Sequence, residues 1–138
     1  MEKRQRNMEN TRIHDKLKQA RNFLSEAEAL LSEGAELSFV INSLYYAMLY
    51  PVLALLGAWK ITTYSQSTSI STFDREFIEP GLFDKRFSEA LHRAFELRPA
   101  CACEGQKVIT REDIERLLTQ ARDFSDAVEK CLKDISSD

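Results

Sequence analysis

The chain has 138 residues, of which 43% are hydrophobic and 30% charged, and its formal net charge is −3. A chain of this length forms one domain and buries about 68% of its unfolded surface, so its stability requires neither a disulfide nor a metal. The small negative charge excludes the overall basic field typical of many nucleic-acid-binding domains. One domain over 1–138 is therefore expected, with 1–8 and 135–138 frayed.

The charge is unevenly distributed along the chain. Residues 1–22 contain seven basic residues against three acidic ones, so this segment carries +4 and the remainder −7; the basic residues are Lys3, Arg4, Arg6, Arg12, Lys16, Lys18 and Arg21. This pattern is typical of a solvated helix. It is also compatible with a basic arm that contacts phosphate, and both interpretations stay open.

The three cysteines, Cys101, Cys103 and Cys131, are an odd number, and two of them are only two positions apart. This spacing does not predict a disulfide framework. A zinc site would need Cys131, which lies well along the predicted last helix, to approach Cys101 and Cys103. Neither a metal nor another cofactor is therefore expected. The charged N-terminus lacks the apolar core of a signal peptide, and a cytoplasmic protein with free thiols is predicted.

The first predicted helix covers residues 8–33. Its apolar residues recur at alternating spacings of four and three, which places them in one seam along an amphipathic helix: Ile13, Leu17, Ala20, Leu24, Ala27 and Leu31. Gly34 follows directly, at the position where a glycine commonly ends a helix.

Residues 37–59 contain no charged side chain, and they predict a helix over 38–56 that Gly57 ends. The length would suffice to cross a membrane. However, the stretch includes Asn42, Ser43 and Pro51, and a helix that is apolar all round is also what the centre of a soluble bundle requires. We therefore expect the central helix of a bundle and no membrane.

The second half of the chain predicts three more helices. A polar loop over 60–68 leads to a helix over 68–79, which Pro80-Gly81 ends, and then to a helix over 83–98 before Pro99. Thr110 with Asp113 has the form of a capping box for a last helix over 111–134. The fold class expected is all-α, an antiparallel up-and-down bundle of four long helices and one shorter helix.

Four stretches of this sequence resemble the HEPN-domain family of small prokaryotic proteins. They are INSLYYAMLYPVLALLG at 41–57, FDREFIEPG at 73–81, ALHRAFELR at 90–98 and GQKVITREDIERLLTQARDFSDAVEKCL at 105–132. The resemblance spans about Ala27 to Leu132, which is most of the chain.

The resemblance implies a compact helical bundle that is usually a homodimer. It also implies a minimal nucleotidyltransferase as partner, in a toxin–antitoxin pair. Active members of the family are metal-independent ribonucleases with an Arg-x4-6-His motif. In that chemistry the histidine moves a proton and the arginine stabilises charge on the phosphate.

The family's arginine corresponds to Arg98, and Cys103 stands where a histidine would follow. Arg98 and Cys103 are therefore the catalytic candidates, although a lone thiol needs an activating base. Arg98 either binds phosphate or pairs with an acid such as Glu104 or Glu96.

The remaining binding candidates are Asn42, Tyr46, Tyr50, Gln66 and Glu104. Asn42, Tyr46 and Tyr50 share a helix face by their i, i+4 spacing. That face either lines a ligand cleft with Arg98 or supplies hydrogen bonds within a core or an interface.

Other residues fit functional patterns less well. Arg86 and His92 match Arg-x5-His in form, but six positions on a helix correspond to about 240°, so the two side chains are expected to point apart. Trp59 and Tyr64 either stack on a base or close the end of the core.

The sequence thus predicts a HEPN-type component of a toxin–antitoxin-like pair with a nucleotidyltransferase, which binds RNA or a nucleotide. Two alternatives stay open. One is an active metal-independent ribonuclease that uses Arg98, and the other is a structural helical adaptor or dimerisation module.

Overall fold

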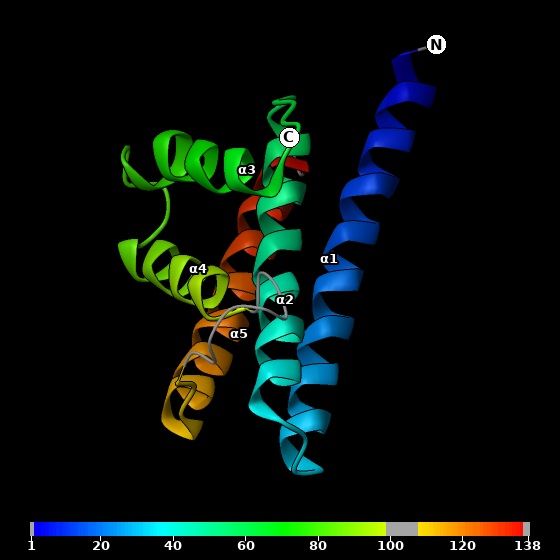
Figure 1. Ribbon diagram of the computed structural model, residues 1–138. Coiled ribbons are helices and arrows are strands. Elements are labelled where there is room, and N and C mark those ends of the chain that lie inside the picture. Colours follow the sequence, from blue (N-terminus) through cyan, green and yellow to red (C-terminus); the bar gives the residue numbers. More distant parts are fainter. Residues whose placement is uncertain (1, 99–107, 137–138) are drawn as a thin grey trace.

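The computed structural model describes the backbone of residues 2–98 and 108–136 and the side chains of 10–98 and 108–133. In these residues the chain forms helices and no strand, which confirms the all-α class (Figure 1). The elements are α1 (Glu2–Ser32), α2 (Leu37–Ala58), α3 (Gln66–Phe73), a π-helical turn (Asp74–Ile78), α4 (Lys85–Leu97) and α5 (Arg111–Ser136).

Helix α2 lies at the centre of the bundle, where it contacts α1, α3, α4 and α5. By length and composition it could cross a membrane, but 72% of its most apolar window is buried inside the protein. Val40, Ile41, Leu44, Met48 and Val52 are completely buried along it. Burial against these neighbouring helices over most of its surface accounts for the uncharged stretch, as a core helix requires.

Helix α1 packs along α2 through the predicted seam, in which Ala20, Leu24 and Ala27 are buried. Its described start, Glu2, lies six residues before the predicted one. Gly34 ends it with φ +78°, and the Ala35 N–H donates to the carbonyl of Leu30 at 3.0 Å. This geometry is a Schellman motif, in which glycine takes the left-handed conformation without strain.

The predicted end of α2 at Gly57 was wrong. The helix continues to Ala58, and Lys60 takes the left-handed conformation with φ 60° while the Ile61 N–H donates to Leu56 O at 2.8 Å. Beside this turn, Trp59 packs edge-on against Phe77 at 5.0 Å and so closes the core, as one of the two interpretations expected. Tyr64 is 94% exposed and does not contribute to the core.

The helix predicted over 68–79 was wrong in both its bounds and its regularity. Ser65 caps α3 by accepting from the Thr68 N–H at 3.1 Å, so the helix begins at Gln66. After Phe73 the backbone widens into a π-turn, in which the Glu79 N–H donates to Asp74 O at 2.9 Å. Such turns occur often at functional sites, and this one places Phe77 in the core.

Helices α4 and α5 complete the bundle around an aromatic cluster. Phe124 of α5 contacts the rings of Phe73, Phe83 and Phe87 at centroid distances of 5.1 to 5.9 Å. The predicted cap of α5 is confirmed, because the Asp113 N–H donates to Thr110 Oγ1 at 3.1 Å. Helix α4 is shorter than predicted and begins after Asp84, whose carboxylate accepts from the Arg86 N–H at 2.9 Å.

Candidate functional site

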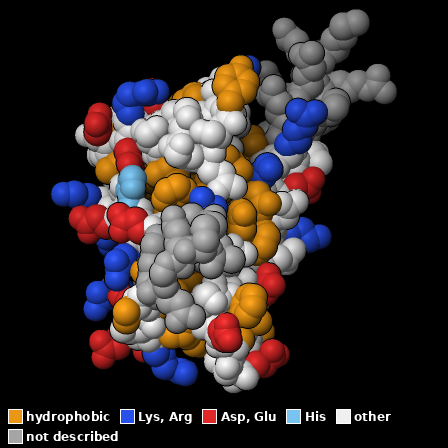
Figure 2. Space-filling model, in the orientation of Figure 1, with side chains coloured by type: hydrophobic (Ala, Val, Ile, Leu, Met, Phe, Trp, Pro, Cys, Tyr) orange, Lys and Arg blue, Asp and Glu red, His pale blue; other side chains and the backbone are white. Residues whose placement is uncertain are grey.

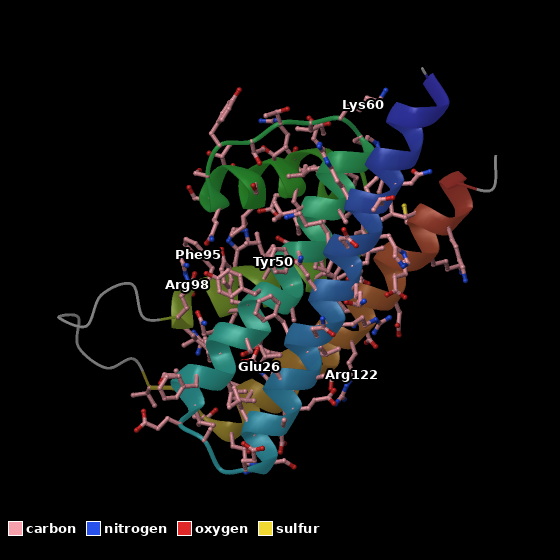
Figure 3. The ribbon with its side chains drawn as sticks, turned by 90° about the vertical axis from the view of Figure 1, so that its right-hand side faces the viewer. Glu26, Tyr50, Lys60, Phe95, Arg98 and Arg122 are labelled. Carbon is pink, nitrogen blue, oxygen red and sulfur yellow. The ribbon has the colours of Figure 1, made fainter. Side chains whose placement is uncertain are left out.

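Arg98 is the residue at which α4 ends. Its backbone is extended, with φ −70° and ψ 142°, as expected for a residue that precedes a proline. Its N–H still donates to Ala94 O at 3.1 Å, so its position relative to the helix is fixed. The half-buried side chain therefore leaves the last turn of α4 in a defined direction, toward α2 and α3 (Figure 3).

The guanidinium of Arg98 lies against two aromatic rings. Its central carbon is 4.7 Å from the centre of the Tyr45 ring and 4.6 Å from that of Phe95. The two rings are 5.8 Å apart and tilted by 54°. Both contacts are within the range of cation–π attraction, which Arg favours because its planar cation is weakly hydrated.

Gln66 connects these groups from the first turn of α3. Its Oε1 accepts hydrogen bonds from the Tyr45 hydroxyl at 2.7 Å and from Arg98 Nη1 at 3.2 Å. Since the oxygen takes both bonds, the amide NH2 of Gln66 is left to point elsewhere, and it finds no acceptor among the described residues. One side-chain amide thus links α2, α3 and α4.

Burial raises the pKa of Tyr45 above its ordinary value of 10, and the positive charge of Arg98 opposes that rise. The phenol therefore stays neutral and acts as a donor to Gln66 at physiological pH. The outward groups of the site are then the remaining N–H groups of Arg98 and the NH2 of Gln66. A set made only of donors suits an anion such as phosphate.

Within the part of the chain that the structure describes, Arg98 has no carboxylate partner. Glu96 is exposed on α4. Cys103 and Glu104 lie outside the described residues, so their assigned roles stay predictions. Among the residues that are described, no three His, Cys, Asp or Glu side chains come together as a metal site would require.

Tyr46 and Tyr50 extend the site from Tyr45 toward α1. Tyr46 lies 5.2 Å from the Tyr45 ring and 6.1 Å from Tyr50, and Phe23 of α1 contacts Tyr46 at 5.4 Å and Tyr50 at 5.3 Å. The rings of Phe23, Tyr46 and Tyr50 are half-buried, and Asn42 is exposed on the same stripe of α2. In Figure 3 the labelled side chains run from Arg98 and Phe95 on α4 through Tyr50 on α2 to Glu26 on α1.

Arg86 and His92 point apart, as their spacing predicted. Arg86 bonds Asp123 at 2.9 Å and Gln120 at 2.6 Å, both on α5. His92 Nε2 lies 2.6 Å from a carboxylate oxygen of Asp74 in the π-turn. The two side chains therefore act in different contacts and do not form a catalytic pair.

Two members of the site, Tyr45 and Phe95, were absent from the predicted site residues. Phe95 precedes Arg98 by three positions, a spacing that brings side chains together on a helix and could have indicated the cation–π contact. Tyr45 carries the only hydroxyl among the largest fully buried side chains described, and a buried hydroxyl normally finds a partner. That partner, Gln66, lies 21 positions away and is not indicated by any local pattern.

The profile of the HEPN domain matches residues 13–131, so this chain belongs to the HEPN family. A UPF0332 protein of Thermotoga maritima is 30% identical over 118 residues, which cover 86% of this chain and 89% of that protein. A Methanocaldococcus jannaschii protein named "putative toxin" is 28% identical over 107 residues, which cover 78% of this chain and 73% of that protein.

Proposed function

We propose that this HEPN protein is the toxin-like member of a cytoplasmic pair with a small nucleotidyltransferase, and that it binds RNA with Arg98 on a phosphate. The observation that carries this proposal is the arrangement of Arg98. Its cation is held by Tyr45, Phe95 and Gln66, and within the described residues no carboxylate neutralises it.

This arrangement favours phosphate on physical grounds. The two rings and Gln66 restrict the guanidinium before any ligand arrives, which lowers the entropy lost on binding. A guanidinium also matches the oxygens of a phosphate with two parallel hydrogen bonds. The half-buried rings beside it offer surfaces on which unpaired bases can stack, as single-stranded RNA requires.

The partners are proposed from the relatives and from the surface. The name of the M. jannaschii relative supports a toxin-like role, and the family resemblance supports the nucleotidyltransferase partner and a homodimer. Phe39, Leu82 and Val108 are 59–81% exposed and supply apolar surface for such contacts. Light scattering tests the homodimer, and co-purification with a co-expressed nucleotidyltransferase tests the partner.

The RNA-binding proposal is tested by fluorescence anisotropy with a labelled single-stranded RNA at two salt concentrations. Arg98→Ala is expected to weaken binding about tenfold and to reduce the salt dependence. Arg86→Ala is the matched control, because it removes the same charge from α4 at a side chain that faces α5. Equal affinities of wild type and Arg98→Ala would contradict the proposal.

The same samples separate binding from catalysis. Incubation of RNA with the protein in EDTA, followed by a denaturing gel, measures metal-independent cleavage. Cleavage by the wild type that Arg98→Ala abolishes would make the protein a ribonuclease. Binding without cleavage at high protein concentration would assign Arg98 to recognition.

A further inference from the structure

A shallow pocket of about 310 Å³ lies between α1 and α2, and Arg98 is not among the residues that line it. It is lined by Gln19, Asn22, Phe23, Glu26 and Tyr50. Two of these residues present flat aromatic surfaces, two carry amides and one carries a carboxylate. The pocket thus combines a stacking surface with hydrogen-bonding groups of both kinds.

A continuous series of ring contacts connects this pocket to Arg98. Arg98 lies 4.7 Å from Tyr45, Tyr45 lies 5.2 Å from Tyr46, and Tyr46 lies 6.1 Å from Tyr50 in the pocket wall. Tyr45 is fully buried and forms the base of the series, while Tyr46 and Tyr50 are half-buried. Figure 2 shows hydrophobic and basic side chains next to one another in the middle of one face.

A basic residue lies at each end of the series. Lys16 Nζ is 5.1 Å from the centre of the Tyr50 ring, opposite the end that Arg98 occupies. Aromatic rings between cations are the arrangement with which proteins hold single-stranded nucleic acid, because the bases stack while the phosphates meet the charges. An apolar peptide would leave the amides, the carboxylate and the two cations without hydrogen-bonding partners.

We infer that the pocket between α1 and α2 binds one base of the single-stranded RNA whose phosphate Arg98 contacts, and that Glu26 selects a base with an amino group. This inference rests on the proposed function. The base stacks on Tyr50 and Phe23, and Gln19 and Asn22 hydrogen-bond its edge. The Glu26 carboxylate only accepts hydrogen bonds, so the amino groups of adenine, cytosine and guanine fit it. Uracil has no amino group, and its one edge donor, N3–H, lies between two carbonyl oxygens that the carboxylate repels.

The test compares the binding of labelled eight-nucleotide oligo-A, oligo-C and oligo-U to the wild type. Oligo-A and oligo-C are expected to bind about tenfold more tightly than oligo-U. Glu26→Gln should abolish this preference, because an amide also donates to uracil. Glu33→Gln removes the same charge from the exposed turn that follows α1 and should leave the preference unchanged.

A second variant tests stacking. Tyr50→Leu is expected to weaken all three oligonucleotides about tenfold, with its fold checked by circular dichroism. If no oligonucleotide binds the wild type, the proposed function fails, and this inference with it. If Arg98→Ala weakens binding but neither base preference nor a Tyr50 effect exists, this inference alone is overturned. It is also overturned if Tyr50→Leu changes the mass in solution and leaves RNA affinity intact, because a second copy then covers the face.

Discussion

The guanidinium of Arg98 lies 4.7 Å from the centre of the Tyr45 ring, and both side chains donate to the same oxygen of Gln66. Tyr45 is fully buried in α2, whereas Arg98 reaches the surface from the end of α4. The interior of the bundle therefore fixes the position of a charge that faces solvent. A substitution in the core at Tyr45 should therefore change the position of Arg98 in the candidate binding site.

The hydroxyl of Tyr45 should contribute to stability in a pH-dependent way. Tyr45→Phe is expected to lower the free energy of unfolding by about 1 kcal/mol at pH 7, because one hydrogen bond to Gln66 is lost. The folded pKa of Tyr45 is raised by burial, so the neutral phenol is the stabilising form. Its contribution is complete below the ordinary value of 10 and is lost as the pH rises through the raised value.

Urea unfolding of the wild type and Tyr45→Phe at pH 7 and above pH 10 measures this difference. Tyr64→Phe is the matched control, since Tyr64 is 94% exposed and its hydroxyl should contribute nothing. A stability difference between wild type and Tyr45→Phe that stays constant across the alkaline range would contradict the assignment.

The sequence predicted the parts of this structure that depend on local patterns. Helical periodicity identified α1, the uncharged stretch identified α2, and the Thr110–Asp113 pattern located the start of α5 at Arg111. The π-turn after Phe73 was not predictable from the sequence. Its Asp74 contacts Ser88 and His92 of α4, which lie 14 and 18 positions away, and no local pattern indicates these contacts. The site divides in the same way. Arg98 followed from the family resemblance, whereas the buried partner Tyr45 emerged only when the helices were packed together.

The capping box of α5 should respond to acid. Hydrogen bonds from Thr110, aided by the charges of Arg93 and Arg116, hold the pKa of Asp113 below its ordinary value of 3.8 against the opposing effect of burial. The ionised carboxylate therefore stabilises the fold above that value, and its contribution is lost as the pH falls through the lowered pKa. Asp113→Ala is expected to cost about 1 kcal/mol at pH 7 and less near pH 3.

Thermal or urea unfolding at both pH values measures the cap. Glu112→Ala removes a neighbouring carboxylate from the same turn and is expected to cost only a few tenths of a kcal/mol through the helix dipole. Equal losses of unfolding free energy in the two variants at pH 7 would show that the negative charge alone stabilises the start of α5, and not the hydrogen bonds of the cap.

Substitutions at two of the left-handed residues that follow helices, Gly34 and Lys60, are expected to change stability in opposite directions. Gly34 has φ +78°, and a Cβ there would meet no atom within 4 Å, so Gly34→Ala costs only conformational energy, about 1 kcal/mol. Lys60 already occupies the left-handed region, and Lys60→Gly should stabilise the protein by about 0.5 kcal/mol. Urea midpoints measure both changes, and a shift of both variants in the same direction would contradict the argument.

The carboxylate of Asp74 connects the π-turn to α4 through two contacts. Its Oδ1 accepts from Ser88 Oγ at 2.6 Å, and its Oδ2 lies 2.6 Å from His92 Nε2. Asp74→Ala is expected to lower the free energy of unfolding by about 2 kcal/mol, because Ser88 is buried and loses its partner. Since the preceding helix α3 also supplies Gln66, RNA affinity should fall as well, by less than in Arg98→Ala.

Urea unfolding of Asp74→Ala, Ser88→Ala and the double variant measures the coupling between these two residues. The double variant should lose less than the sum of the single losses, because both substitutions break one shared hydrogen bond. Asp84→Ala is the control for RNA affinity, since it removes a carboxylate that caps α4 at the opposite end from Arg98. Additive losses in the double variant would mean that the bond between Asp74 and Ser88 does not contribute to stability. The connection between the π-turn and α4 would then depend on the contact of Asp74 with His92.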